Sequence, residues 1–229
     1  MWEREPQDGT ARAVGEWQAG VPRELPRGAN ALSPELVLIS QRGRLLEAVV
    51  EAVAEFGYAA TTVQEITRRA RVSRTTFYEQ FANKEECFLV AYEAGTRAHL
   101  EHMRRAIRRT DVWLAQLTEG VWAYVELLAG QPAYARTFLL EVHKAGDRAL
   151  ERQRMNHGLY ADLLREWHGR RPPGAGAPVS DEFFVGAVGA INEVIVDRLH
   201  KAGVIGLADL SRTITQMLLA LLRIEQVER

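Results

Sequence analysis

The chain has 229 residues, of which 47% are hydrophobic and 26% are charged, and its formal net charge is −1. This length and apolar content suit one or two globular domains and exclude disorder as the main state. The near-zero net charge argues mildly against nucleic-acid binding, because DNA-binding domains are usually strongly basic. Because Cys87 is the only cysteine, an intramolecular disulfide and a multi-cysteine zinc site are excluded.

Residues 1–33 contain prolines, glycines and scattered charges without apolar periodicity, which predicts a mostly disordered N-terminal arm. Its arginines suggest a contact with a DNA minor groove, but five acidic residues in the same stretch argue against one. The start of the chain lacks the basic and apolar regions of a signal peptide, and no apolar run approaches the roughly 20 residues that span a membrane. We therefore expect a cytoplasmic protein.

The first predicted helix begins at Ser33-Pro34, where serine suits the N-cap and proline the first helical position. Its apolar pattern continues to Phe56, and Gly57-Tyr58 interrupts it. Together with the two short helices that follow, it predicts a three-helix domain over residues 34–84.

Two short helices are predicted next, each opened by its own N-cap. Residues 62–65, Thr-Val-Gln-Glu, have the form of a capping box, and the apolar face of this helix ends near Ala70. Ser73 caps the second helix, on which Phe77 and Phe81 are four residues apart and therefore share one face. This face can pack against the first short helix and direct the remaining side chains outward.

The outward side chains of the second short helix are donors, acceptors and an aromatic group, the types that contact phosphates and base edges. They are Arg74, Thr75, Thr76, Tyr78 and Gln80. Seven basic and six acidic residues lie between Glu35 and Lys84, and five of the seven basic ones lie between Arg68 and Lys84. A solvated surface helix has a similar composition, but the order of capped helices favours a helix-turn-helix DNA reader whose second helix enters the major groove.

The run FGYAATTVQEITRRARVSRTTFYEQFANKEECF resembles the N-terminal DNA-binding domain of TetR-family transcriptional regulators. Its most specific parts are Val72-Ser73, the pair Phe77-Tyr78, Phe81, and the Asn83-Lys84-Glu85 that follows. The resemblance covers about residues 41–92; beyond it, the chain is similar to the family only in size and helical character.

The resemblance implies the roles of individual residues toward double-stranded DNA. Thr62 and Gln64 contact phosphate, Arg74, Thr75 and Thr76 face base edges and backbone, and the Tyr78 hydroxyl and Lys84 each bind a phosphate. The full expected set is Thr62, Gln64, Ser73, Arg74, Thr75, Thr76, Tyr78, Gln80 and Lys84. Relatives often carry glycine or another small residue in place of Thr75 and histidine in place of Gln80, so the operator sequence cannot be transferred from a relative.

After Lys84 the pattern is helical throughout, so the fold is predicted to be all-α with about nine helices. The expected helices cover about 85–109, 111–130, 132–144, 147–167, 181–201 and 207–226, and Arg171–Ser180 forms a loop. We expect Cys87 to pack at the start of the first of these. Residues 85–229 are accordingly predicted to form a larger helical domain for ligand binding and dimerisation.

The helix containing FFVGAVGAINEVIVDRL is too apolar to face solvent, and its small residues allow another backbone to approach closely. The resemblance implies that it and the last helix form a four-helix bundle across a two-fold axis. The expected interface residues are Gly186, Gly189, Ala190, Met217, Leu218 and Leu221. The alternative is that the two helices bury each other within one subunit. A homodimer implies a near-palindromic operator.

Aromatic side chains distributed over the central helices can form the wall of a cavity for an apolar small-molecule effector, although core packing is their commoner use. Two polar residues, Glu126 and Asn192, interrupt apolar stretches and need buried partners. The candidate ligand residues are Trp113, Trp122, Glu126, Phe138, Met155, Phe184 and Asn192. We expect no metal, because the histidines offer no convincing ligand set, and no cofactor.

The sequence therefore predicts a DNA-binding transcriptional regulator that acts as a homodimer, with a repressor released by ligand as the favoured form. A transcriptional activator is the main alternative, and an all-helical enzyme or a protein-binding module are others. The chain contains no Gly-rich phosphate loop, no H-E-x-x-H and no G-x-S-x-G sequence. We therefore expect no enzymatic activity and no catalytic residues.

Overall fold

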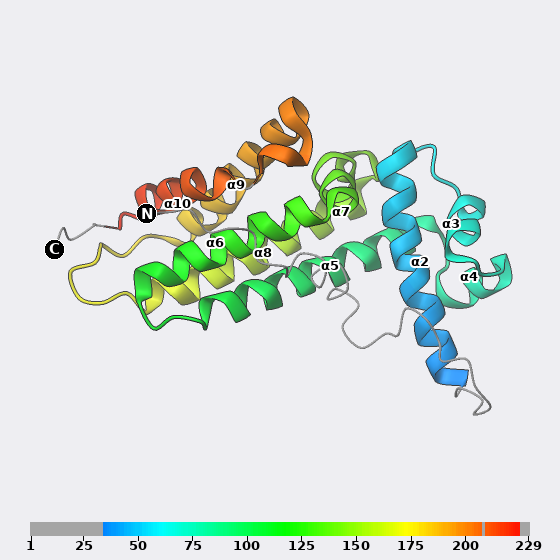
Figure 1. Cartoon of the computed structure of the whole chain (residues 1–229), viewed down its shortest axis with the longest axis horizontal. Coiled ribbons are helices and arrows are strands. Elements are labelled where there is room, and N and C mark those ends of the chain that lie inside the picture. The colour runs from blue at the N-terminus through cyan, green and yellow to red at the C-terminus, as the bar shows by residue number, and fades with distance from the viewer. Residues whose placement is uncertain (1–33, 208, 225–229) are drawn as a thin grey trace.

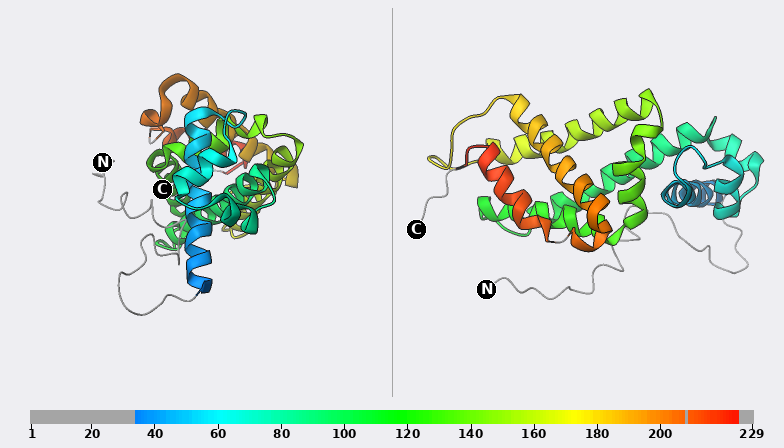
Figure 2. Two further views of the ribbon diagram at one scale, coloured as in Figure 1. Left: turned by 90° about the vertical axis from the view of Figure 1, so that its right-hand side faces the viewer. Right: turned by 90° about the horizontal axis from the view of Figure 1, so that it is seen from above.

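The structure is a computed structural model and describes residues 34–207 and 209–224. Within these ranges the chain forms nine α-helices and no β-strand, as the sequence predicts. The predicted N-terminal arm lies outside the described residues. The molecule is elongated, with the N-terminal helices at one end and α10 toward the other (Figures 1 and 2).

The N-terminal domain consists of α2 (Pro34–Phe56), α3 (Val63–Ala70) and α4 (Arg74–Gln80). Both predicted caps are present: the Thr62 hydroxyl accepts from the Glu65 N–H at 3.2 Å, and that of Ser73 accepts from the Thr76 N–H at 2.9 Å. Arg71 ends α3 in the left-handed conformation at φ +53°, which turns the chain into α4. Short caps and a tight turn therefore set the angle between the two short helices.

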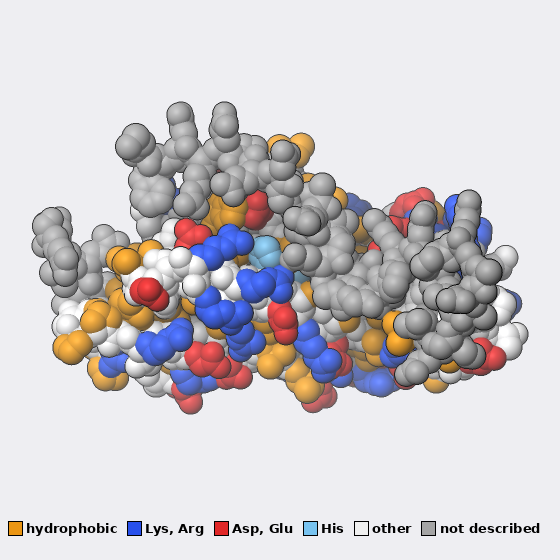
Figure 3. Space-filling view, turned by 60° about the horizontal axis from the view of Figure 1, so that its bottom comes forward, with side chains coloured by type: hydrophobic (Ala, Val, Ile, Leu, Met, Phe, Trp, Pro, Cys, Tyr) orange, Lys and Arg blue, Asp and Glu red, His pale blue; other side chains and the backbone are white. Residues whose placement is uncertain are grey.

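The long helix α5 (Lys84–Ile107) connects the two parts of the molecule and lies beside α6 (Trp113–Gly130) and α8 (Asp147–Gly169) (Figure 1). Ion pairs join α8 to α5, with Arg148 Nη1 2.8 Å from Glu85 Oε2 and Arg152 Nη1 3.2 Å from Glu93 Oε2. On the face drawn in Figure 3, Lys and Arg side chains gather in a band with acidic side chains among them.

The segment expected as one helix over 132–144 is instead three short pieces. They are α7 (Pro132–Ala135), a π-helical turn (Arg136–Leu140) and a 3-10 turn (Val142–Lys144). A π-helical turn accommodates more residues per turn than an α-helix and changes the direction of its side chains. Here Thr137 donates to the Val50 carbonyl of α2 at 2.9 Å, a contact between distant parts of the chain that the local sequence does not encode.

The last two α-helices are α9 (Asp181–Ala202) and α10 (Leu210–Leu221), separated by a 3-10 turn (Gly203–Gly206). The predicted loop before α9 is confirmed, whereas α10 is shorter than the expected 207–226. Buried side chains of both parts form one continuous apolar core, from Leu45 and Phe77 to Phe138 and Leu218. Among the helices that the structure describes, none is both long and apolar enough to cross a membrane.

Candidate functional site

The helix α4 is held by two buried phenylalanines and leaves its first turn exposed. Phe77 and Phe81 are 0% and 1% exposed, and their ring centroids are 5.7 Å apart, so the predicted anchoring of this helix is confirmed. Ser73, Arg74 and Thr75 are exposed at the N-terminal end. An exposed polar first turn on a firmly packed short helix is the geometry that reads a DNA groove.

The other predicted DNA contacts surround this turn. Thr62 and Gln64 are exposed at the start of α3, and the Tyr78 side chain is 51% exposed. Thr76 is half-buried, and its hydroxyl is 2.9 Å from the Ser73 hydroxyl. Gln80 is also half-buried, and its backbone carbonyl accepts from Arg42 Nη1 at 3.3 Å. Thr76 and Gln80 are thus less available to DNA than Ser73, Arg74 and Thr75.

Lys84 lies in a different environment from the one expected of a side chain that extends toward phosphate. Its ammonium group donates to the carbonyls of Tyr58 at 2.7 Å and Thr61 at 2.8 Å, and it lies 4.3 Å from the centre of the Tyr58 ring. Partial burial lowers the pKa of Lys84. Two of its three N–H donors are therefore used to fix the loop between α2 and α3, which leaves one for an outside partner.

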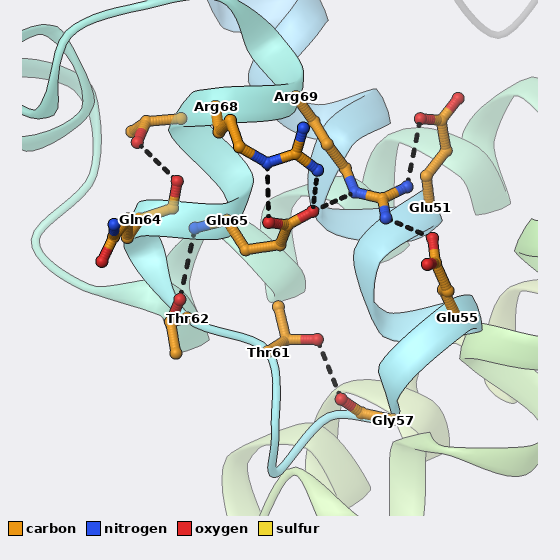
Figure 4. Close-up of polar contacts among 10 residues, drawn as sticks. Glu51, Glu55, Gly57, Thr61, Thr62, Gln64, Glu65, Arg68 and Arg69 are labelled. Atoms are coloured by element: carbon orange, nitrogen blue, oxygen red, sulfur yellow. Dashed lines mark hydrogen bonds and ion pairs between the residues drawn. The ribbon is translucent and has the colours of Figure 1, made fainter.

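Two of the five basic residues predicted between Arg68 and Lys84, Arg68 and Arg69, are paired with glutamates of the domain (Figure 4). Glu65 accepts from Arg68 Nη2 at 2.6 Å and from Arg69 Nε at 2.7 Å, and Arg69 also pairs with Glu55. The hydrogen bonds from Arg68 and Arg69 lower the pKa of Glu65 to about 2. The glutamates come from α2 and α3, so a count of basic residues along the sequence overstates the charge offered to DNA.

Cys87 lies in the core, as expected, with its Sγ 3.8 Å from the Leu45 carbonyl. Burial raises the pKa of the Cys87 thiol, which keeps it protonated and unreactive.

A cavity lies inside the larger domain, with walls from α5, α6, the segment 134–139, α8, α9 and α10. Its volume is about 900 Å³ when the solvent at its mouth is included. Most of its lining is apolar or aromatic, and no Lys, Arg, Asp or Glu of the described residues lines it. Its walls have the character of a site for an apolar small molecule.

Two of the predicted ligand residues, Phe138 and Asn192, line the cavity, and the other five lie outside its lining. Trp113 stacks on Trp167 at 4.4 Å, and each indole N–H donates to the other's backbone carbonyl. Phe184 is buried against His168, with ring centroids 5.4 Å apart.

Met155 is 57% exposed, and Trp122 and Glu126 are half-buried outside the cavity lining. These residues pack or face solvent according to helix orientations that the sequence alone does not fix.

Tyr124 and Tyr160, two of the aromatic side chains expected on the central helices, line the cavity. Tyr92, Tyr134 and His99 also line it, and the sequence analysis did not single them out. Burial is the main cause that raises the pKa of each tyrosine hydroxyl. The tyrosines come from four separate segments, so no local spacing in the sequence signals them; only a general excess of buried tyrosine in the central helices could have suggested the cluster.

Gly95 allows the Tyr134 ring to lie directly on α5. A Cβ atom at Gly95 would meet Tyr134 Cε2 at 2.0 Å, far inside contact distance. The Tyr134 hydroxyl lies 3.5 Å from the Thr96 hydroxyl. The shape of the cavity at this end therefore depends on the absence of a side chain at position 95.

A chain of aromatic contacts connects the cavity with the N-terminal domain. Tyr92 stacks on Phe138 at 4.5 Å, Phe138 contacts Phe88 at 5.0 Å, and Phe88 contacts Tyr58 at 5.0 Å. Tyr58 is the residue whose ring and carbonyl hold Lys84. A second link joins the Tyr58 N–H to Glu141 at 3.1 Å. Packed groups thus connect Phe138 with the loop before α3.

The predicted interface residues divide between two environments. Gly186 and Gly189 are exposed, with open space where a Cβ would stand, and Ala190 is half-buried. Met217 and Leu221 are half-buried, whereas Leu218 is 1% exposed and lines the cavity. Leu218 therefore belongs to the core of the single chain, unlike the other predicted interface residues. Phe183 and Val185 add exposed apolar surface to α9.

Residues 45–91 match the family model described as bacterial regulatory proteins, tetR family. The chain is 30% identical over 103 residues to the HTH-type transcriptional activator FasR of Mycolicibacterium smegmatis, covering 45% of this chain and 47% of that protein. It is 29% identical over 124 residues to the fatty acid metabolism regulator protein of Bacillus subtilis, covering 53% and 62%. The matches thus span about half the length of these curated relatives.

Two solved structures have the same fold. The fatty acid degradation regulator FadR from Bacillus halodurans superposes with a TM-score of 0.69 at 21% identity, covering 83% of this chain and 97% of that one. The transcriptional regulator FadR from Bacillus subtilis, solved in complex with stearoyl-CoA, gives a TM-score of 0.65 at 21% identity, covering 77% and 96%.

Proposed function

We propose that the chain is a sequence-specific DNA-binding transcriptional regulator, because the region around α3 and α4 matches the tetR family model and has helix-turn-helix geometry. The observation that carries the proposal is the exposed polar first turn of α4, capped by Ser73 and held in place by buried Phe77 and Phe81. No catalytic role is needed to account for these features, and the similar proteins of known role are regulators of transcription.

On DNA, α4 enters the major groove by its N-terminal half. Arg74 and Thr75 are the exposed residues that reach base edges, since a guanidinium forms paired hydrogen bonds to guanine. Thr62, Gln64 and the Tyr78 hydroxyl contact phosphates on either side. The remaining N–H of Lys84 adds a phosphate contact, while its other two hold the loop at Thr61.

The regulator acts as a homodimer whose interface includes the exposed face of α9. Gly186 and Gly189 permit close approach of a second helix, and Phe183 and Val185 are apolar groups that gain from burial. A two-fold dimer places two recognition helices about one turn of DNA, roughly 34 Å, apart. The operator is accordingly near-palindromic.

The effector is an apolar small molecule held in the cavity, and a long-chain fatty acyl-CoA is its chemical class. The cavity walls suit an acyl chain, and similar proteins are named for fatty acid metabolism or solved with stearoyl-CoA. A chain that displaces Phe138 shifts Phe88 and Tyr58 in turn. The coupling required to release DNA is modest, on the order of 1–3 kcal/mol.

Repression by occupancy of a promoter, relieved by the effector, is the favoured mode. Activation is the second candidate, supported by the similarity over 103 residues to an activator. Transcription in vitro from a template that carries the selected operator separates the two, because added protein lowers the transcript yield in the first mode and raises it in the second.

Selection of bound sequences from random DNA by the full chain tests the function. We expect a near-palindromic motif whose binding weakens with salt. Tyr78→Phe removes only the hydroxyl and should weaken binding to all sequences, whereas Glu79→Gln on the same helix is a matched control with no predicted contact. Failure to select any motif at moderate salt, with a protein that unfolds cooperatively, would overturn the proposal.

Release of the selected operator by stearoyl-CoA tests the effector class. Fluorescence anisotropy of a labelled operator should fall on addition of stearoyl-CoA and stay constant with coenzyme A alone. If the operator is bound but no acyl-CoA changes its affinity, the acyl-CoA class is wrong while DNA recognition stands.

A further inference from the structure

A histidine without a partner lies in the wall of the cavity, in the middle of α5. His99 is 0% exposed, and neither of its ring nitrogens has a hydrogen-bond partner among the described residues. Its ring lies 4.3 Å from that of Tyr134 and 6.2 Å from that of Tyr124, measured between centroids. A buried polar group in this position costs free energy unless something in the cavity bonds to it.

The surroundings define the charge of that missing partner. Burial lowers the pKa of His99 to about 3, and the Gln131 side chain, which lies close to the imidazole but outside hydrogen-bond geometry, opposes this shift only in part. The imidazole is therefore neutral near pH 7, with one donor and one acceptor nitrogen. Besides His99, the titratable groups of the described lining are four tyrosines and His157, and no cation is present to hold an anionic group. The partner is accordingly uncharged.

We infer that His99 is a specificity-determining residue that hydrogen-bonds a neutral hydroxyl or ketone oxygen carried on an otherwise apolar effector chain. The inference rests on the proposed cavity effector and refines its chemistry. A saturated chain would fill the same space but leave both ring nitrogens unpaired. A hydroxyl can donate to one nitrogen and accept from the other, and a ketone accepts from the N–H.

The phosphates and other charged parts of coenzyme A do not suit this position, because the lining near His99 offers them no cation. The oxygen recognised by His99 therefore belongs to the chain inside the cavity and not to the head group at its mouth. Discrimination between chains with and without this oxygen follows from the penalty of leaving a buried polar group unmatched.

Isothermal titration of the full chain with acyl-CoA probes tests the inference. The probes are stearoyl-CoA and its analogues with one hydroxyl at different chain positions. The variants are His99→Leu and the control Met155→Leu, whose side chain is exposed and lies outside the cavity lining. In the wild type and in Met155→Leu, we expect the best hydroxylated probe to bind roughly tenfold more tightly than stearoyl-CoA. In His99→Leu this preference should disappear.

Equal affinity for hydroxylated and plain chains in the wild type overturns the inference, and so does a preference that survives in His99→Leu. Naphthalene and 2-naphthol form a second pair that does not depend on coenzyme A. If no acyl-CoA binds, the acyl-CoA effector class fails, and tighter binding of 2-naphthol by the wild type but not by His99→Leu still supports the role of His99. In that case, equal binding of naphthalene and 2-naphthol, or binding of neither, overturns the proposed role of His99.

Discussion

The helix-turn-helix domain and the cavity domain differ in how tightly their interiors are packed and in the partners of their polar groups. Around α3 and α4 the aromatic side chains fill the core, and the charged groups Arg68, Arg69 and Lys84 are bound to protein oxygens. The larger domain instead lines a cavity and leaves His99 without a hydrogen-bond partner. The three charged groups of the first domain are thus paired within the protein, whereas the cavity of the second has a polar group that the proposed effector would pair.

Truncation of core side chains gives the largest expected contrast between the two domains. Phe77→Ala should lower the free energy of unfolding by about 3–5 kcal/mol, because it opens a void in a filled core. Leu163→Ala, in the cavity wall, should fall toward the lower end of the range of about 2–5 kcal/mol, since it enlarges a space that already exists. Urea unfolding measures both, and an equal loss per atom removed would contradict the contrast.

The cavity should make the free energy of unfolding sensitive to acid, through His99. His99 has a folded pKa of about 3, below its ordinary value near 6.5, so between these pH values the unfolded chain binds a proton that the folded chain does not. Unfolding free energy therefore falls as pH falls through this window, with a contribution of about 1.4 kcal/mol per pH unit from this residue. His99→Leu should flatten the slope between pH 6.5 and pH 4, measured by urea unfolding.

Met103→Leu is the control for this experiment, because it changes the same wall without removing a titrating group. Its pH dependence should match that of the wild type. An unchanged slope in His99→Leu would mean that the imidazole gains a proton while the chain is still folded.

Replacement of Arg74 should weaken operator binding more than replacement of Arg68, although composition does not distinguish the two residues. Arg74 is exposed on α4, and Arg74→Ala should cost about 1–3 kcal/mol in operator binding and relax the preference at one base position. Arg68 is held by Glu65, so Arg68→Ala should weaken binding much less. Electrophoretic mobility shifts with the selected operator compare the two, and equal losses would show that the Glu65 pairing opens on DNA.

The smallest change in the free energy of unfolding is expected for substitutions at the start of α3. Thr62→Ala removes the cap on the Glu65 N–H and should lower the free energy of unfolding by about 1 kcal/mol. Thr62→Ser keeps the hydroxyl and should retain the wild-type stability. Thermal unfolding followed by circular dichroism distinguishes them, and a Ser variant as unstable as Ala would assign the effect to the lost methyl group.

Local chemistry made the helix-turn-helix domain predictable. The caps at Thr62 and Ser73 and the spacing of Phe77 and Phe81 act within four residues, and all are found in the structure. The environment of Lys84 was not predictable, because its partner Tyr58 is 26 residues away and approaches only when α2 and α5 have packed. The same holds for the pairing of Arg69 with Glu55.

The residues that line the cavity were harder to predict from the sequence. Phe138 and Asn192 were identified by aromatic character and by the interruption of an apolar run, but the same reasoning selected Trp113, whose partner Trp167 lies 54 residues away. Which face of each helix turns inward depends on the packing of six elements together. The π-helical turn at 136–140 shifts that orientation again, and the sequence there resembles an ordinary helix.

The internal pairing of α3 also bears on how this regulator would respond to its ionic surroundings. Arg68 and Arg69 already have carboxylate partners, so their approach to DNA displaces few of the cations condensed on the phosphates. With few counterions released by the described residues, operator affinity should have a shallow dependence on salt. Occupancy of the operator would then change little when the ionic strength around the protein rises, and control would remain with the proposed effector.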